Sequence, residues 1–384
     1  MTDRVDVVYI NRLFAEIASA LRCKLVDGKG RTIVTHVGFN AGDLIFNGRP
    51  LHVVCEDMSN KTFRMLVGLK LDLEYEPIWY WCALNSFTED DKVNKSDIRL
   101  ISNEAQKQLL MLYRPESTGI SSGVLEIARY IPMTNVQLEK VEALLQTWKY
   151  NCFEHSEAPL GFSTYFLASF FSHSCTPNAI WNESPTSGFS LRARRPISPG
   201  EEISISYIPE DNLVRPAAER RQALESTKSF VCQCERCTSE QPVEISSMEN
   251  KLKDMLEDKI ISEAHAVLIS ELAESLSDSS WVKARAFGLL TDFCLAKRNS
   301  VSQALAYARR RLSLFLSTLG EKDRMNAALA WSLEEVGDLE IANSNFQVGL
   351  EELNRARDIL ITLFGEDDSN VQAVESKIQK IVSL

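Results

Sequence analysis

The sequence predicts an α+β protein, with a β-rich N-terminal part that carries a helical insertion and an all-α C-terminal part. Short runs with period-2 alternation bounded by turn residues, such as Ile203 to Tyr207 after Pro199-Gly200, predict the strands. Apolar residues at helical spacing predict helices within residues 86–150 and again from residue 245 to the end. A group of three closely spaced cysteines lies between the two parts.

The composition is that of a globular protein of two or three domains. The chain has 384 residues, of which 45% are hydrophobic and 25% charged. Its net charge of -11 argues against nonspecific nucleic-acid binding, which depends on neutralising phosphates with lysine and arginine. Nine cysteines and an N-terminus without an apolar signal segment favour a reducing compartment. The most apolar run, residues 162–171, is too short to span a bilayer, so we expect a cytoplasmic or nuclear protein with no membrane partner.

The N-terminal segment begins with a helical pattern and then becomes strand-like. Leu13, Ile17 and Leu21 share one face and predict a helix over residues 9–21. The turn 27–31, Asp-Gly-Lys-Gly-Arg, contains two glycines that permit a positive φ, and by itself it predicts an ordinary hairpin. Strands are expected on both sides of this turn and in the segments 43–47 and 50–55.

Residues 86–150 predict a helical insertion between the strands. Its strongest helical pattern lies near the C-terminal end and comprises Val136, Leu138, Val141, Leu144, Leu145 and Trp148. Residues 106–113 predict another helix. The segment 115–123 is rich in serine, threonine and glycine and predicts a loop between the two.

Cys232, Cys234 and Cys237 supply three thiolates within six residues. This spacing suits zinc, which prefers four tetrahedral sulfur or nitrogen ligands. Cys175 is the best candidate for the fourth ligand, and such a site would fasten the cysteine-rich segment onto the loop after His173. Two alternatives stay open: three unrelated thiols, which the dense spacing disfavours, and disulfides, which a chain without secretory features disfavours.

The C-terminal part contains an internal repeat. The segment from Ala304 to Asp323 resembles the segment from Gly349 to Asp368, with an offset of 45 residues. We therefore expect antiparallel helix pairs like tetratricopeptide repeats, which stack to bury a shared core. Its large aromatic residues are expected in that core rather than at a ligand, and they are Trp281, Phe287, Phe293, Trp331 and Phe346. Peptide binding on the concave face is the alternative.

Three separated motifs carry a resemblance to a known family. They are Ser-His-Ser-Cys-Thr-Pro-Asn at 172–178, Gly-Glu-Glu-Ile-Ser-Ile-Ser-Tyr at 200–207, and Cys-x-Cys-x-x-Cys at 232–237. In this order they resemble the SET-domain protein lysine methyltransferases, and most closely the SMYD branch. The resemblance covers about residues 23–237 and, more loosely, 245–384.

The resemblance implies a domain organisation. It implies a SET domain over 1–227 with a helical insertion at about 86–150, a post-SET zinc segment over 228–240, and a tetratricopeptide-like helical domain over 245–384. In the SMYD branch a MYND zinc finger is inserted after the first strands. Here Cys55 and Cys82 are solitary, so we expect that finger to be absent.

The resemblance also implies an activity, the transfer of a methyl group from S-adenosylmethionine to a lysine amine by in-line displacement. The lysine would enter a channel of aromatic side chains, where desolvation favours the neutral amine. Tyr207 matches the catalytic hydroxyl. The substrate channel is matched by Phe153, Tyr165 and Lys228. The cofactor site is matched by Lys29, Gly30, Arg31, Asn151, Ser172, His173, Tyr207 and Phe230, and the site of one structural Zn²⁺ by Cys175, Cys232, Cys234 and Cys237.

Two positions depart from the family pattern. Ser172 replaces the usual asparagine and predicts weaker cofactor binding, because a hydroxyl offers fewer hydrogen bonds than an amide. Lys228 stands where SMYD relatives often carry a second channel tyrosine, which leaves the number of transferred methyl groups open. Both keep an alternative alive: a catalytically weak or inactive SET scaffold that binds partners through its helical repeats. The favoured partner is a protein substrate with a target lysine, without specific nucleic-acid binding.

Overall fold

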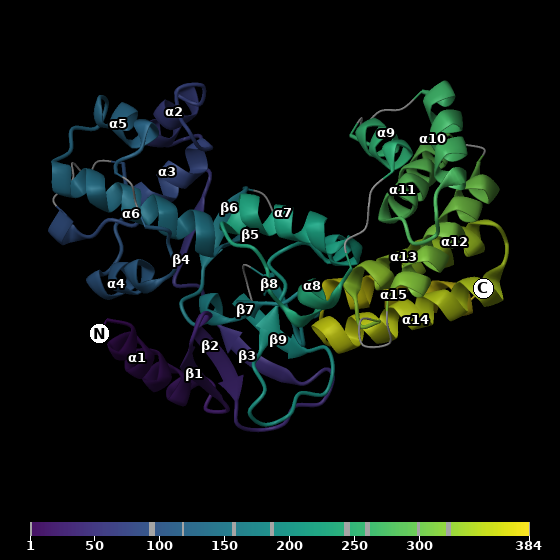
Figure 1. Cartoon of the computed structure of the whole chain (residues 1–384), viewed down its shortest axis with the longest axis horizontal. Coiled ribbons are helices and arrows are strands. Elements are labelled where there is room, and N and C mark those ends of the chain that lie inside the picture. Colours follow the sequence, from purple (N-terminus) through teal and green to yellow (C-terminus); the bar gives the residue numbers. More distant parts are fainter. Residues whose placement is uncertain are drawn as a thin grey trace.

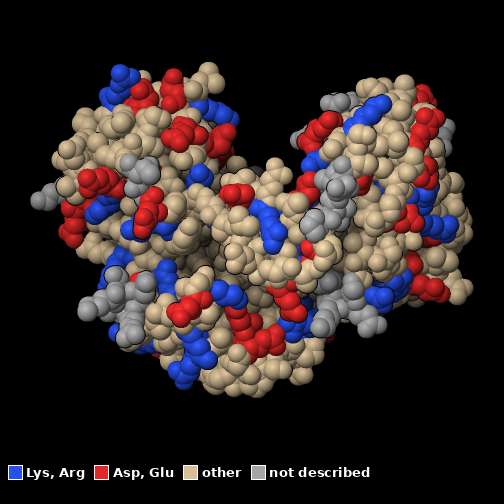
Figure 2. Space-filling view, in the orientation of Figure 1, with Lys and Arg blue, Asp and Glu red and all other residues tan. Residues whose placement is uncertain are grey.

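The computed structural model describes residues 2–91, 97–116, 119–155, 159–184, 188–241, 246–257, 262–297, 300–319 and 324–383. Figure 1 shows a β-rich centre between two helical lobes, one formed by α2 to α6 and the other by α9 to α15. In Figure 2 a notch separates the tops of these lobes, and α7 lies at its floor. The predicted α+β class is confirmed. The predicted boundaries at 227 and 240 stay predictions, and the one at 245 falls outside the described residues.

The chain begins with helix α1 (Thr2–Ile17) and the antiparallel hairpin of β1 (Leu21–Val26) and β2 (Gly30–Thr35). The hairpin confirms the strands predicted around the turn. The predicted helix 9–21 was wrong in where it ends and in which side chains it buries. Ile10 and Phe14 are fully buried, whereas Ile17 is 59% exposed. The helix stops at Ile17 because Leu21 already pairs with Thr35, so the apolar spacing that continued to Leu21 crossed an element boundary.

Three small sheets follow. The first has the order β3-β9-β8, with β3 at Leu44–Gly48, β9 at Gly188–Ala193 and β8 at Ala179–Ser184. The second has the order β4-β6-β5, with β4 at His52–Cys55, β6 at Gly161–Thr164 and β5 at Cys152–His155. The third pairs β7 (Ser172–His173) in parallel with β10 (Ser204–Ile205). This last pairing brings two of the sequence motifs side by side.

The helical insertion begins earlier than predicted. Its helices are α2 (Lys61–Gly68), α3 (Pro77–Leu84), α4 (Asn103–Met111), α5 (Ser122–Ala128) and α6 (Asn135–Asn151). Nearly every residue of α3 is buried, so its sequence has no apolar stripe and gives no helical period. Helix α6 is held at its start by a capping box between Thr134 and Gln137, and it runs directly into β5.

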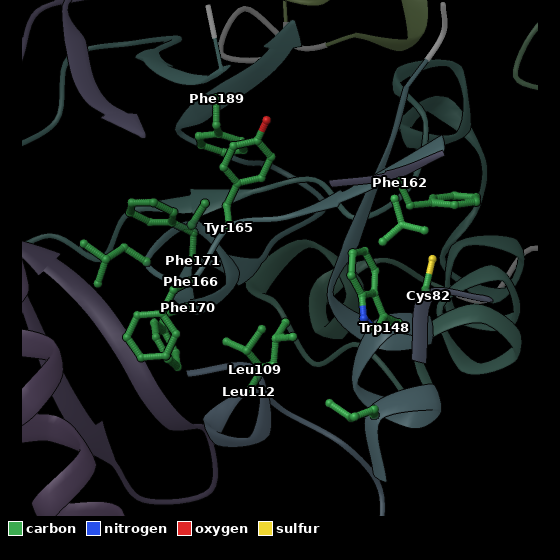
Figure 3. Close-up of a cluster of buried hydrophobic side chains, with 14 of the residues drawn as sticks. Cys82, Leu109, Leu112, Trp148, Phe162, Tyr165, Phe166, Phe170, Phe171 and Phe189 are labelled. Carbon is green, nitrogen blue, oxygen red and sulfur yellow. The ribbon is translucent and has the colours of Figure 1, made fainter. Parts of the chain in front are cut away.

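The main core lies between these sheets and helices. Figure 3 shows its aromatic side chains, among them Phe166, Phe170 and Phe171 on one side and Trp148 and Phe162 on the other. After β10 come a 3-10 helix (Glu210–Val214), α7 (Ala217–Lys228) and α8 (Glu235–Ser239). These pack into a separate small cluster around the cysteines.

The C-terminal helices are α9 (Ser247–Met255), α10 (Glu263–Ser275), α11 (Trp281–Ala296), α12 (Val301–Thr318), α13 (Ala327–Ala342), α14 (Phe346–Phe364) and α15 (Ser369–Val382). Consecutive helices pack together from α9 to α15, as the predicted repeat requires. The repeated turn at 320–323 lies outside the described residues. Trp281 and Phe287 are buried as predicted, and Phe293 is partly buried. The prediction was wrong for Trp331 and Phe346, which are 45% and 47% exposed, because small residues such as Gly337 and Gly349 form the contact between α13 and α14.

The C-terminal helices dock onto the β3-β9-β8 sheet through α14. The Asn182 amide donates a 2.8 Å hydrogen bond to the Asp368 carboxylate, and Arg194 donates to the carbonyl of Met325 at 3.2 Å. Gly365 has a φ of 91°, and a Cβ there would lie 2.6 Å from Nη2 of Arg192. Among the described helices, none is long and apolar enough to cross a membrane.

Candidate functional site

Tyr207 follows β10 and is held at both its hydroxyl and its backbone. Its hydroxyl donates a 2.6 Å hydrogen bond to the carbonyl oxygen of Phe171. Its backbone N–H donates to Nδ1 of His173 at 3.0 Å. Burial raises the pKa of Tyr207 above its ordinary value, and the negative charge of Glu202 raises it further. The phenol is therefore a protonated and oriented group at neutral pH.

His173 connects Tyr207 to the cysteine cluster. Because Nδ1 accepts the N–H of Tyr207, the ring proton of the neutral imidazole belongs on Nε2, which lies 3.3 Å from Sγ of Cys175. Burial lowers the pKa of His173 to about 4, so the ring is neutral at pH 7. With its lowered pKa and with both ring nitrogens in contact, His173 suits a structural role and not that of a catalytic proton acceptor.

Phe230 completes the surroundings of Tyr207. Helix α7 ends at Lys228, and Ser229 takes a left-handed conformation with φ of 56° that turns the chain. The Phe230 ring then lies 6.3 Å from the Tyr207 ring and 6.1 Å from the His173 ring, between their centroids. Three predicted site residues from three separate segments are thus brought together.

The predicted channel aromatics lie in a second aromatic group. The Phe153 ring centroid is 5.5 Å from that of Tyr165 and 5.0 Å from that of Trp181. The Tyr165 hydroxyl donates to Glu183 at 2.8 Å. The indole N–H of Trp181 donates to the carbonyl of Ser206 at 3.2 Å, which connects this group to the residue before Tyr207. Trp181 was missed from the sequence because only the pairing of β8 with β9 puts it there.

Lys228, the third predicted channel residue, lies beside Tyr207. Its Nζ is 6.0 Å from the centroid of the Tyr207 ring and donates a 3.2 Å hydrogen bond to the carbonyl of Tyr150. Burial lowers the pKa of Lys228, and the nearby Cys152 opposes this shift. A half-buried amine therefore lies beside the ring of the predicted catalytic tyrosine.

The β1–β2 turn approaches the same region through Lys29. Its Nζ forms a 2.8 Å ion pair with Glu202, the carboxylate whose charge also acts on Tyr207. Oε1 of Glu202 is buried and has no hydrogen-bond partner among the described residues. Gly30 has a φ of 78°, and a Cβ there would meet nothing within 4 Å, so the turn has open space on that side. The sequence motifs did not place Glu202 in the site, because its role depends on this ion pair with a residue far away in the sequence.

Two predicted cofactor residues already have side-chain partners. Nη1 of Arg31 donates to the carbonyl of Met111 at 2.9 Å, and its guanidinium stacks 4.9 Å from the ring of Phe170. The amide nitrogen of Asn151 donates to the carbonyls of Tyr113 and Thr147, at 2.6 and 2.7 Å. The structure therefore does not direct these two side chains to Tyr207. Ser172 is half-buried in β7, opposite Ser204 of β10.

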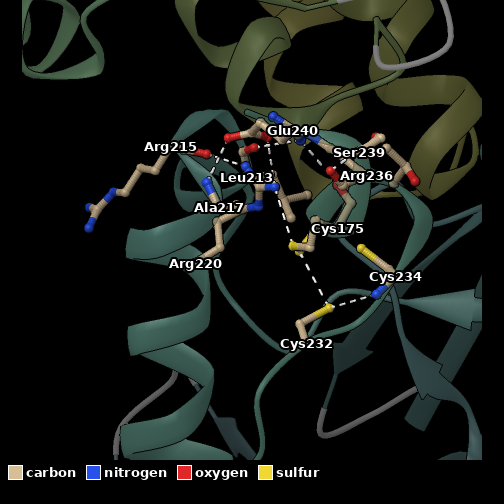
Figure 4. A network of polar contacts seen from close by, with 12 residues as sticks. Cys175, Leu213, Arg215, Ala217, Arg220, Cys232, Cys234, Arg236, Ser239 and Glu240 are labelled. Atoms are coloured by element: carbon tan, nitrogen blue, oxygen red, sulfur yellow. Dashed lines mark hydrogen bonds and ion pairs between the residues drawn. The ribbon is translucent and has the colours of Figure 1, made fainter. Parts of the chain in front are cut away.

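The four predicted zinc ligands form one cluster. The sulfurs of Cys175, Cys232, Cys234 and Cys237 all lie within 4.8 Å of one another. Sγ of Cys175 is 3.5 Å from that of Cys237 and 4.0 Å from that of Cys232. A tetrahedral zinc ion with Zn–S bonds near 2.3 Å requires sulfurs about 3.8 Å apart. The cluster is therefore compatible with one zinc ion, and Figure 4 shows three of these side chains turned toward a common centre.

Arginine side chains surround this cluster. Arg220 is fully buried, and its Nη2 donates to Sγ of Cys237 at 3.4 Å and to Glu240 at 3.0 Å. Arg221 donates to the carbonyls of Cys232 and Cys237. Zinc with four thiolates carries a net charge of about -2, which a buried guanidinium offsets. Figure 4 shows Arg220 reaching from α7 toward the sulfurs. No local pattern indicated a role for Arg220, since a pair of arginines on a helix is usually exposed.

Comparisons with known proteins match the central part of the chain to a known family. The family model of the SET domain matches residues 30–208. The histone-lysine N-methyltransferase SET5 of Yarrowia lipolytica is 36% identical over 106 residues, which cover 25% of this chain and 23% of the relative. The human N-lysine methyltransferase SMYD2 is 33% identical over 95 residues, covering 25% of this chain and 21% of the relative. The matched segments thus span less than a quarter of either relative.

Among solved structures, the SET domain of LSMT bound to lysine and AdoHcy aligns over 99% of both chains, with 12% identity and a TM-score of 0.35. The family match assigns residues 30–208 to the SET domain. Over a quarter of its length the chain is similar to the SMYD2 and SET5 lysine methyltransferases.

Proposed function

We propose that this chain is an S-adenosylmethionine-dependent protein-lysine N-methyltransferase. One observation carries the proposal: within the SET domain, the Tyr207 hydroxyl is fixed on the carbonyl of Phe171 with Phe230, His173 and Lys228 around its ring. The names of the relatives support the reaction class. The reaction needs little more from a protein than orientation of donor and acceptor and exclusion of water.

Tyr207 is proposed as the catalytic hydroxyl, and Phe153, Tyr165 and Lys228 as residues of the lysine channel. When bound, S-adenosylmethionine supplies a methyl group on a sulfonium. The chain's task is to hold a lysine amine in line with that methyl group, and to hold it neutral, because an ammonium has no lone pair. A half-buried aromatic environment favours the neutral amine by desolvation.

The cofactor site is proposed at Lys29, Gly30, Arg31, Asn151, Ser172, His173, Tyr207 and Phe230. Oε1 of Glu202 is buried and has no partner in the described part of the chain, which fits this ligand because the oxygen can accept a hydrogen bond from a cationic amine or a ribose hydroxyl. Phe230 offers a half-buried ring for an adenine to pack against. Arg31 and Asn151 would act mainly by fixing the backbone around the site, since their side chains have other partners.

A structural zinc ion is proposed at the four cysteines. It would join Cys175, which follows β7, to the segment that carries Phe230, so the metal would hold one wall of the site. The four ligands are all thiolates, which leaves no open position for catalysis at the metal.

The substrate is proposed to be a protein with a target lysine, in the cytoplasm or the nucleus. The notch in Figure 2 offers such a protein a route to α7, whose last residue is Lys228. The C-terminal helices, which form one side of the notch, are the proposed place for a further protein partner.

Calorimetry with S-adenosylmethionine tests the proposal directly. The expected result is saturable heat with one cofactor per chain, followed by transfer of label from the cofactor to a protein in a cell extract. The alternative function is an inactive SET scaffold that binds partners through its helices. Lys228 beside Tyr207 favours that alternative, since it occupies space that a substrate lysine needs. No heat of binding at a high micromolar concentration of S-adenosylmethionine would favour the inactive scaffold.

A further inference from the structure

We propose that Lys228 is a self-methylation site, so that the chain transfers a methyl group to its own Lys228 amine. The inference rests on the proposed function and adds to it a specific modified residue. The Lys228 amine lies beside the ring of the proposed catalytic tyrosine.

Lys228 is placed at the site from within the chain. It is the last residue of α7, and the chain turns at Ser229 before Phe230 packs against Tyr207. Nζ of Lys228 lies 6.0 Å from the Tyr207 ring centroid. The Lys228 amine therefore lies next to the Tyr207 side chain, which is proposed to orient an incoming substrate lysine.

A purely structural role for Lys228 is the competing explanation. Its Nζ donates to the carbonyl of Tyr150 in the last turn of α6, where a cation is favourable. This contact is a single 3.2 Å hydrogen bond, however, and an ammonium has three donors. No carboxylate lies within ion-pair distance of Lys228 among the described residues. The contact is thus weak enough to leave the amine free to move.

The surroundings favour a neutral amine at this position. Burial lowers the pKa of Lys228, and Cys152 of β5 acts against this shift. Tyr207, on the other side, keeps its proton because its own pKa is raised. Of these neighbours only a Cys152 thiolate would favour the charged amine, and burial raises the pKa of that thiol to about 11.

The chemical step balances with S-adenosylmethionine as the only co-reactant. The lone pair of Nζ forms the new nitrogen–carbon bond. The sulfur–methyl bond breaks, and its electron pair stays on sulfur as a neutral thioether. The secondary ammonium that results releases one proton to water. The four-carbon stem of a lysine is flexible, so Nζ can move from the carbonyl of Tyr150 toward the Tyr207 hydroxyl without a change in the backbone.

Peptide mapping by mass spectrometry is the main experiment. The full chain is incubated with S-adenosylmethionine alone, and the expected product carries one added methyl mass on the peptide that contains Lys228. The gain disappears in Lys228→Arg and persists in Lys149→Arg. Lys149 is a matched control, because it is half-buried and its ring contacts among the described residues are with Tyr75 and Tyr150. Transfer within one chain also predicts that the rate per molecule stays constant over about a tenfold dilution.

A second measurement needs no cofactor. Competitive acetylation with acetic anhydride across a pH series reports the pKa of each lysine amine by mass spectrometry. Lys228 is expected to react at a lower pH than a free lysine side chain added as an internal standard, because burial lowers its pKa. Reaction of Lys228 at the same pH as the standard would contradict the proposed environment of Lys228.

The outcomes separate this inference from the proposed function. Label on other proteins with none on Lys228 overturns self-methylation and leaves the lysine methyltransferase in place. No binding of S-adenosylmethionine overturns both. Label on Lys228 that survives in Tyr207→Phe at the wild-type rate contradicts the geometry argued above, because the transfer would then not use this site. Circular dichroism and zinc content verify that each variant is folded.

Discussion

The hydroxyl of Tyr207 donates a 2.6 Å hydrogen bond to the main-chain carbonyl of Phe171, across 36 residues of sequence. This bond fixes the phenol against the end of the 3-10 helix Ala168–Phe170, which precedes β7, so the orientation of the hydroxyl depends on backbone and not on a flexible side chain. The parallel pairing of β7 with β10 makes the contact possible. A side chain held in this way loses little freedom when a substrate arrives.

The first prediction concerns this hydroxyl. Tyr207→Phe removes the hydrogen bond to Phe171 but keeps the ring that packs against Phe230 and His173. We expect methyl transfer to fall by about 100-fold, because the loss of one orienting contact misplaces the reacting groups. Cofactor affinity, measured by calorimetry, is expected to stay within about threefold of wild type.

Tyr130→Phe is the control for this experiment, since Tyr130 is 54% exposed at the end of α5 and takes no part in the site. It is expected to behave as wild type in both assays. Full turnover in Tyr207→Phe would remove Tyr207 from the catalytic role, whatever the cofactor affinity.

Much of the candidate site could be predicted from the sequence because short motifs carry it. Cys232, Cys234 and Cys237 are held close by their own spacing, and the fourth ligand, Cys175, lies in a second motif. Tyr207 and His173 likewise lie in local patterns that the chain reproduces. In each case the residues that carry the chemistry lie in short motifs, although long-range contacts bring those motifs together.

The rest depends on tertiary contacts that no local pattern contains. Glu202 joins the site through an ion pair with Lys29, from 173 residues away in the sequence. Arg220 resembles an exposed helix residue until α7 packs on the cysteines and buries it. Helix α3 was missed because a helix buried on all sides has no apolar stripe. Trp331 was predicted to be buried because it is hydrophobic, but its exposure depends on how α13 packs against α14.

The second prediction concerns the metal. Wild-type protein is expected to contain about one zinc per chain by metal analysis, because the four sulfurs fit a single tetrahedral ion. Cys234→Ser removes one ligand and is expected to lose most of that zinc. Amide exchange of residues 229–231 is then expected to quicken, since this segment lies directly before the ligands.

Cys55→Ser is the matched control, because Cys55 is half-buried like Cys234 but lies in β4, outside the cluster. Its zinc content is expected to equal that of wild type. Zinc-free wild-type protein, purified without chelators, would count against the cluster as a metal site.

The third prediction tests the charge beside the sulfurs. Arg220→Met replaces a fully buried guanidinium that donates to Cys237 with an apolar side chain of similar length. The thiolate cluster then loses a neighbouring positive charge, so zinc affinity is expected to fall by about 10- to 100-fold in competition with a chelator. Stability is expected to fall as well, because Glu240 loses its buried partner.

Arg194→Met separates these two effects. Arg194 is also a buried arginine, and it is paired with Glu210, but it lies outside the cysteine cluster. This variant is expected to lose stability and keep its zinc affinity. Equal zinc affinity in the two variants would show that Arg220 acts only through packing.

The fourth prediction concerns the pH dependence of stability. His52 is buried in β4, where its Nε2–H donates to the carbonyl of Asn85 at 2.9 Å and its ring packs on Trp148. Burial lowers the pKa of His52 from 6.5 to about 4. Between these two values the unfolded chain binds more protons than the folded chain, so stability falls as the pH falls from 6.5 toward 4. The full loss from this one group is about 3 kcal/mol.

His52→Gln keeps an N–H donor for Asn85 but cannot titrate. Urea unfolding at pH 7.5 and pH 4.5 is therefore expected to show a smaller loss of stability in His52→Gln than in wild type. His265→Gln, at an exposed position of α10, is expected to retain the wild-type loss. Parallel losses in wild type and His52→Gln would mean that the imidazole takes up its proton in the folded chain, and that β4 opens to water near that residue.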